Sequence, residues 1–355
     1  MNNHQFTLHA KAAVLDNQQI ISPAWIQINK GIIQSIGIHK PDDPGPITDL
    51  SELILLPGFV NAHCHLELTG IGKLAEKDFV AWIKELIQIK IALSDDLVSS
   101  GIEQGIEKLV SSGVTSIFDH ISFNTPLAPY SHAKARIIGF GEVLGTNYEQ
   151  ACFVHQQQSL QKKNASIPYH LSPHAIHSLH PHMIDKLFKD ESKPFSIHLH
   201  ESQTESDYFT TQLGSLFDFI KERVPDLNTT PLHKAQSAIQ YLINQKFDLN
   251  QTLIIHGNYV SDEDLDFMAK QACSVVHCPG SHDFFSHQSF PLKEYLQRGI
   301  PIALGTDSLA SNTEFSFLHE IRLFLKNHPE LTLSEFMPML TTNAYEAIGV
   351  KDIGK

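Results

Sequence analysis

From about residue 55 to its end, the chain alternates between short apolar runs and longer segments in which apolar residues recur every three or four positions. A short apolar run bounded by polar or turn residues is typical of a strand buried on both faces, whereas a recurrence near 3.6 residues is typical of an amphipathic helix. Eight such runs predict strands that begin near Pro57, Thr115, Arg136, Tyr169, Phe195, Thr252, Ser274 and Pro301.

Helical segments lie between these strands. The clearest has apolar residues at positions 98, 102, 106, 109 and 110 and ends before Gly113. Helices are predicted over residues 97–112, 213–224, 262–270, 292–297 and 317–327. Eight β/α units over roughly 300 residues match the size of a TIM-like (β/α)8 barrel, so this α/β fold is predicted for residues 56–355. An open doubly wound sheet would alternate in the same way, but no Gly-x-Gly-x-x-Gly segment follows the first predicted strand.

Residues 1–55 show a different pattern of apolar and polar positions. The segments 6–10, 25–28 and 31–37 read as short strands, the last of them after an Asn-Lys-Gly turn, and residues 42–46 read as a loop. These residues predict a small β-sandwich-like unit that is too short to hold a good core alone. We therefore expect it to pack against the main body.

Composition narrows the choice of partners. The chain carries 26 basic and 39 acidic side chains, for a net charge of −13, and has no dense basic run. Nucleic acid and anionic membrane surfaces are therefore not expected as partners, and a small-molecule substrate is. No signal peptide or apolar run of about 20 residues is present, and the four cysteines are scattered, which indicates a cytoplasmic protein. A homodimer remains open.

Polar residues with metal-binding side chains stand at the ends of several predicted strands. His63 and His65 are two positions apart at the end of the first strand, so both side chains point to one face. His198 and His200 form a similar pair, and the sequence leaves open which of them is a ligand. Asp307 ends the last strand, where a carboxylate could also serve as a helix N-cap. Because the carboxyl ends of barrel strands form one face, these groups are expected to meet there.

Three imidazoles and a carboxylate suit a borderline divalent ion. Zn²⁺ is the leading candidate and Fe²⁺ the alternative, with one position left for water. Such an ion lowers the pKa of bound water to about 7. One divalent metal ion is therefore the expected cofactor.

Three ordered motifs resemble those of the amidohydrolase superfamily: PGFVNAHCH at 57–65, HLHES at 198–202 and LGTDS at 304–308. The resemblance covers about residues 8 to 349. It is nearest to the aminohydrolase branch, which includes aminofutalosine, S-adenosylhomocysteine, adenosine-type and guanine deaminases and triazine hydrolases. It implies one metal ion, because no lysine stands at the fourth strand end, where the two-metal members carry theirs. The implied ligands are His63, His65, His198 and Asp307.

The resemblance also implies catalytic roles. Glu201 matches the proton-shuttling glutamate of the deaminases, His256 matches a histidine that orients the attacking water, and Asp307 takes the proton of that water. Substrate contacts are expected from residues at or near the strand ends, namely His174, Glu142, His277 and Ser308, and from Trp82, which could stack on a ring. For Trp82 core packing is the alternative, and for Glu142 it is a surface role or an ion pair.

Three features depart from the family pattern. Ser308 stands where glycine or alanine is usual, and His282 stands where many relatives carry asparagine. Relatives also continue into strands that complete the small β unit, whereas this sequence ends at Lys355, soon after the last predicted helix. The C-terminal end is expected to complete the unit in part or to leave it smaller.

Together these features predict hydrolytic deamination of an amino-substituted N-heteroaromatic ring, such as an adenosine- or aminofutalosine-type nucleoside or a related purine. The same site could instead hydrolyse a cyclic amide or another C–N bond, although Glu201 favours deamination because a ring nitrogen needs an acid. A non-catalytic, metal-stabilised binding protein is the third reading.

Overall fold

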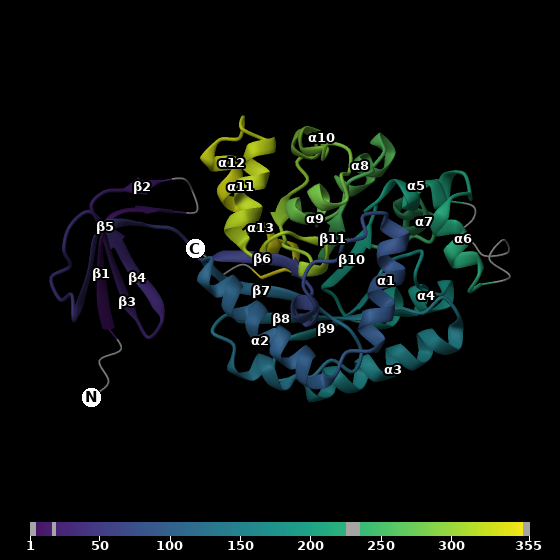
Figure 1. The fold of residues 1–355 in the computed structure, drawn as a ribbon. Coiled ribbons are helices and arrows are strands. Elements are labelled where there is room, and N and C mark those ends of the chain that lie inside the picture. The colour runs from purple at the N-terminus through teal and green to yellow at the C-terminus, as the bar shows by residue number, and fades with distance from the viewer. Residues whose placement is uncertain (1–4, 16–18, 225–234, 351–355) are drawn as a thin grey trace.

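The computed structural model describes residues 5–15, 19–224 and 235–350. The N-terminal strands form a sheet of their own, at one end of the molecule in Figure 1. Its central strand β1 pairs in antiparallel with β2 and β3 and in parallel with β5, and β4 continues the sheet beyond β3. The strands are β1 (Gln5–Val14), β2 (Ile20–Ile21), β3 (Ala24–Asn29), β4 (Ile32–Gly37) and β5 (Ile47–Leu55).

The sequence predicted that this small β unit would pack against the main body, and the structure differs from that prediction. Its apolar cluster is centred on Ala10, Ala13, Ala24 and Ile26 and draws only on residues of these five strands and their connections. No cluster in the described residues combines these side chains with those of the main body. The sheet therefore packs on itself rather than against the main body, from which it stands apart in Figure 1.

The main body contains two four-stranded sheets in which every neighbouring pair is parallel. The strands pair in chain order and begin within two residues of the predicted starts. The first sheet is β6 (Phe59–Cys64), β7 (Val114–Ile121), β8 (Arg136–Val143) and β9 (Tyr169–Pro173). The second is β10 (Phe195–Leu199), β11 (Thr252–His256), β12 (Cys273–His277) and β13 (Ile302–Leu304).

Single parallel bridges connect the two sheets at both seams. Ala175, beyond the end of β9, pairs with His198 of β10, and Cys64 of β6 pairs with Asp307 beyond β13. One interior cluster takes Val60 and Phe140 from the first sheet and Ile255 from the second. The two sheets therefore enclose a common core.

Helices cover the outside of both sheets (Figure 1), and a polar side chain caps the first turn of several of them. Ser94 accepts a hydrogen bond from Leu97 and starts α2, whose buried face includes Ile102 and Leu109. The helices are α1 (Phe79–Ile91), α2 (Asp95–Ser111), α3 (Tyr148–Asn164), α4 (Pro181–Asp190), α5 (Gln203–Thr210), α6 (Ser215–Lys221), α7 (Ala238–Asn244), α8 (Asp262–Met268), α9 (Pro279–Phe284), α10 (Leu292–Gln297), α11 (Phe317–Asn327), α12 (Leu333–Leu340) and α13 (Asn343–Ala347). Across the described residues, none of these is both long enough and apolar enough for a transmembrane segment.

A buried carboxylate joins the start of α9, which follows β12, to the loop that follows β13. Glu320 of α11 has no exposed surface and accepts hydrogen bonds from the Gly280 amide and the Asn312 side chain, both at 2.6 Å. Asn312 in turn donates to the Thr306 carbonyl at 3.1 Å, directly before Asp307. Glu320 thus fixes the backbone from which Asp307 projects.

Replacing Glu320 by alanine is expected to lower the free energy of unfolding by about 2–5 kcal/mol, because it leaves two buried donors unpaired and opens a cavity. Urea denaturation would measure this loss. Glu314→Ala is the matched control, because Glu314 is exposed and, among the described residues, its one ion pair is with His319 at 3.6 Å. Equal midpoints for the two variants would contradict the role given to Glu320.

Candidate active site

The inward faces of the strands change character along their length. On β7 the interior residue Phe118 is followed two positions later by His120, and on β8 Phe140 is followed by Glu142. Because side chains two apart on a strand share a face, the apolar core at the amino ends gives way to polar groups at the carboxyl ends. The candidate site lies in this polar layer.

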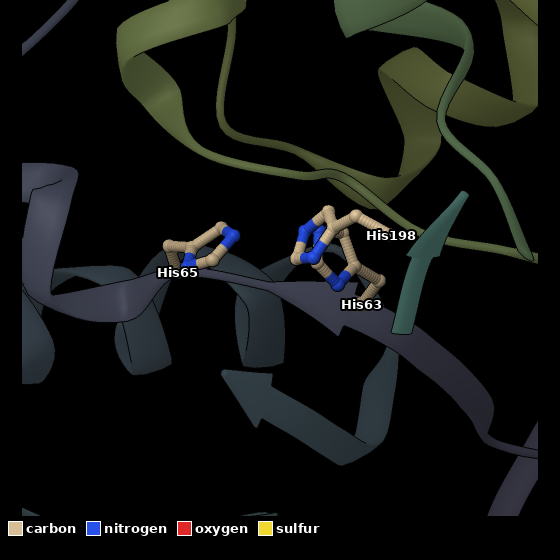
Figure 2. Close-up of side chains that lie close together, drawn as sticks. All are labelled: His63, His65 and His198. Carbon is tan, nitrogen blue, oxygen red and sulfur yellow. The ribbon is translucent and has the colours of Figure 1, made fainter. Parts of the chain in front are cut away.

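Three histidines and an aspartate meet there. His63 and His65 come from the end of β6, His198 from β10 and Asp307 from the loop after β13. One ring nitrogen from each histidine lies within 4.8 Å of the others, and Figure 2 shows the three rings gathered at the strand ends. Asp307 Oδ1 is 3.3 Å from His63 Nε2 and 3.7 Å from His65 Nε2. The structure thus groups His198, not His200, with the first pair.

Three of these side chains, His63, His198 and Asp307, have the protonation states that metal binding requires. Burial lowers the pKa of His63 to about 3 and that of His198 well below its usual value, so both rings are neutral. Burial opposes the charge of Asp307, but its close contact with the His63 imidazole holds the pKa of this carboxyl well below its usual range. Neutral imidazole and ionised carboxylate are the ligand forms, so no proton need be displaced from them.

Glu201 and His256 flank this group. His256 Nε2 lies 3.5 Å from Glu201 Oε1, and one ligand atom each of Glu201, His256 and Asp307 lie within 4.8 Å of one another. Burial, followed by the charges of Asp307 and Glu205, raises the pKa of Glu201 well above its usual value. A carboxyl in this position can carry a proton at neutral pH and give it to a neighbouring base.

The backbone around Glu201 is held by residues that the sequence did not single out. Glu205 accepts a hydrogen bond from the Glu201 amide at 2.8 Å, and Asn258 donates to the Glu201 carbonyl at 2.9 Å. His200 has a φ of +57°, in the left-handed region that non-glycine residues rarely adopt. The two contacts fix the unusual turn from which Glu201 projects, and no signal in the sequence pointed to either partner.

Two of the predicted substrate contacts lie beside His198. Glu142 Oε1 is 3.6 Å from His198 Nδ1, and the His174 carbonyl is 3.0 Å from the same nitrogen. The Glu142 oxygen has no hydrogen-bond partner in the described part of the chain, and the His174 ring contacts Ser178 Oγ at 2.8 Å. Both side chains border the histidine group.

The other three predicted contacts are not part of these groups. Trp82 packs with Leu74, Phe284 and Ala310 and donates to the Ala310 carbonyl at 3.2 Å, as the packing alternative describes. His277 stacks on Phe290 with 3.9 Å between ring centres. Ser308 is adjacent to Asp307 in the chain, and its hydroxyl lies 3.2 Å from Ser311 Oγ. Substrate contact by Trp82, His277 and Ser308 stays a prediction.

Comparison with known proteins places this geometry in a family. The aminodeoxyfutalosine deaminase of Nitratiruptor sp. is 25% identical over 95% of this chain and 85% of its own. A 5-methylthioadenosine/S-adenosylhomocysteine deaminase of Pyrococcus furiosus is 27% identical over 92% of this chain and 78% of its own. The crystal structure of Helicobacter pylori aminofutalosine deaminase with methylthio-coformycin is 22% identical and superposes with a TM-score of 0.85, covering 99% of this chain and 89% of that one. The sequence profile of the amidohydrolase family matches residues 54–355, and the chain therefore belongs to that family.

Proposed function

We propose that this protein is a metal-dependent aminohydrolase that deaminates an adenosine-type nucleoside or a related aminopurine. The observation that carries the proposal is the placement of Glu201, a carboxyl with a raised pKa, beside a buried group of three imidazoles and a carboxylate. The curated relatives are named as deaminases of aminodeoxyfutalosine and of 5-methylthioadenosine and S-adenosylhomocysteine, which supports this substrate class.

The architecture proposed for this activity is a closed (β/α)8 barrel of residues 56–355 with a separate domain of residues 1–55. The bridges at Cys64–Asp307 and Ala175–His198 and the shared interior cluster support closure. A closed barrel would gather the eight strand ends around one mouth.

His63, His65, His198 and Asp307 are the proposed ligands of one divalent ion, and such an ion is typical of the amidohydrolase family. The residues fit: His63 Nε2 is buried, faces the group, and has no hydrogen-bond partner among the described residues. Three nitrogens and one oxygen favour Zn²⁺, with Fe²⁺ as the alternative. When bound, the ion would lower the pKa of a water molecule to about 7 and so supply hydroxide at neutral pH.

The protein side chains carry the protons of the proposed reaction. Asp307 accepts a proton from the attacking water, and His256, 3.5 Å from Glu201, orients that water. Glu201 protonates the ring nitrogen next to the carbon that bears the amino group. Oxygen bonds to that carbon, the C–N bond breaks with a proton delivered to nitrogen, and ammonia leaves. The balance is one water consumed, one ammonia released, and an oxo group in place of the amino group.

Substrate would lie over the mouth of the barrel, against His174 and Glu142. Both lie beside His198, so a ring held over the proposed metal site would be within reach of them. Trp82, His277 and Ser308 are proposed to contact substrate from farther out.

A substrate panel tests this function. Ammonia release is measured for adenosine, 5-methylthioadenosine, S-adenosylhomocysteine, aminodeoxyfutalosine and guanine, with a cyclic amide assayed for ring opening. We expect an adenosine-type nucleoside to be deaminated with kcat/KM above about 10⁴ M⁻¹s⁻¹, the lower end of the usual range for enzymes. Ring opening of the cyclic amide alone would instead support the other hydrolase, and metal binding without any turnover would support a binding protein.

A further inference from the structure

A second buried histidine lies directly behind one of the proposed metal ligands. His120, on the inward face of β7, has no exposed surface, and its Nδ1 is 2.9 Å from Nδ1 of His63. Its other nitrogen, Nε2, is 2.5 Å from the hydroxyl oxygen of Ser196 on β10. Three strands from both sheets thus contribute to one line of polar contacts, from His63 through His120 to Ser196.

The chemistry of imidazole decides which group donates and which accepts in each of these contacts once His63 binds a metal. A neutral imidazole carries one N–H and one free lone pair, and a metal takes the lone pair. If His63 binds through Nε2, which faces Asp307, its proton must be on Nδ1 and is donated to His120. His120 then accepts at Nδ1, so its own proton is on Nε2 and is donated to Ser196. The reverse order, in which Ser196 donates to His120 and His120 to His63, would place the proton of His63 on Nε2, so only the order from His63 to Ser196 leaves Nε2 of His63 free for a metal.

We infer that His120 is a positioning residue, which fixes the tautomer and orientation of His63 so that Nε2 of His63 is presented to the metal. The inference rests on the metal site proposed above. Groups that accept the outer N–H of a ligating histidine are typically carboxylates, carbonyls or water, and here an imidazole takes that part.

Packing holds His120 in this orientation. Its ring stacks on Phe140 with 5.4 Å between centres and 16° between planes. An apolar side chain would fill the same space without the cost of burying two polar nitrogens, as Phe118 does two positions earlier on the same strand. The presence of histidine at position 120 is therefore explained by the contacts of its two ring nitrogens and not by the space that the ring fills.

Two substitutions separate the nitrogens of His120. In His120→Asn the amide oxygen overlays Nδ1 and can still accept from His63, whereas in His120→Gln the amide overlays Nε2 and can reach only Ser196. Zn²⁺ affinity of the metal-depleted full chain would be measured by competition with a chromophoric chelator. We expect His120→Gln to bind about 10- to 100-fold more weakly than the unmodified protein, and His120→Asn within about 3-fold of it.

One further variant and one further measurement test the same inference. Ser196→Ala keeps the imidazole but removes the acceptor that orders its proton, and should weaken Zn²⁺ binding by about 3- to 10-fold. It also serves if His120→Gln does not fold, as judged by circular dichroism. Co²⁺ absorption spectra of the loaded proteins should differ from the unmodified spectrum for His120→Gln and Ser196→Ala but not for His120→Asn.

The outcomes are distinguishable. Equal weakening in His120→Asn and His120→Gln, or none in either, would overturn the inference while leaving the proposed metal site intact. His63→Ala tests that site directly: if it binds Zn²⁺ as tightly as the unmodified protein, the proposed ligand set is wrong and the inference is overturned with it.

Discussion

Glu201→Gln is expected to remove nearly all deaminase activity and to leave the metal bound. Glutamine has the size of glutamate but cannot supply the proton that the ring nitrogen needs. Loss of general acid–base help of this kind lowers kcat by about 10²- to 10⁴-fold. Because Glu201 is not among the three histidines and the aspartate proposed as ligands, the metal content should not change.

Steady-state ammonia release and elemental analysis of the same preparations would check both parts. Glu103→Gln is the matched control, since Glu103 is an exposed residue of α2 and should leave kcat unchanged. Full activity in Glu201→Gln would refute its role as the acid. Loss of metal together with activity would instead place Glu201 among the ligands.

Metal removal should abolish turnover altogether. Dialysis against a strong chelator is expected to reduce activity to background, and stoichiometric Zn²⁺ or Fe²⁺ should restore it, because the nucleophile depends on the ion. Bound metal should also stabilise the fold, by about 2.7 kcal/mol when the free ion is at 100 times its Kd. Thermal melts with and without Zn²⁺ would record that difference.

His63→Ala provides the control for this experiment. It should neither regain activity nor show the Zn²⁺-dependent rise in melting temperature, because it lacks a central ligand. Persistent activity of the unmodified protein after the metal has been shown to be absent would rule out the proposed chemistry.

The positions of the strands in the two parallel sheets could be predicted because these strands are largely buried and most of them contain a short apolar stretch. Helix ends were harder to predict. The segment 213–224 was predicted as one helix, but α6 begins only at Ser215, after Gly214 with φ of +98°. Helix α3 was missed: it buries only Ala151, Val154 and Gln158, so its sequence shows almost no apolar stripe.

In the candidate site, too, some features could be predicted from the sequence and others could not. His63, His65, His198 and Asp307 each end or follow an apolar strand, and their positions in the chain suggested that they meet. Which of His198 and His200 faces the group could not be derived, because His200 has a left-handed backbone that breaks the alternation of a strand. His120 and Glu205 were missed as partners, because each acts through a contact that the linear order does not display.

The proposed metal site can assemble only after both sheets have formed, because each sheet supplies part of it. Two of the proposed ligands belong to the first sheet and two to the second, and the last of them lies at residue 307 of 355. During synthesis, a nascent chain that has emerged only as far as α4 would offer just His63 and His65 to an ion. Tight metal capture must therefore await synthesis of the chain through Asp307, and metal loading would report that the two sheets have docked.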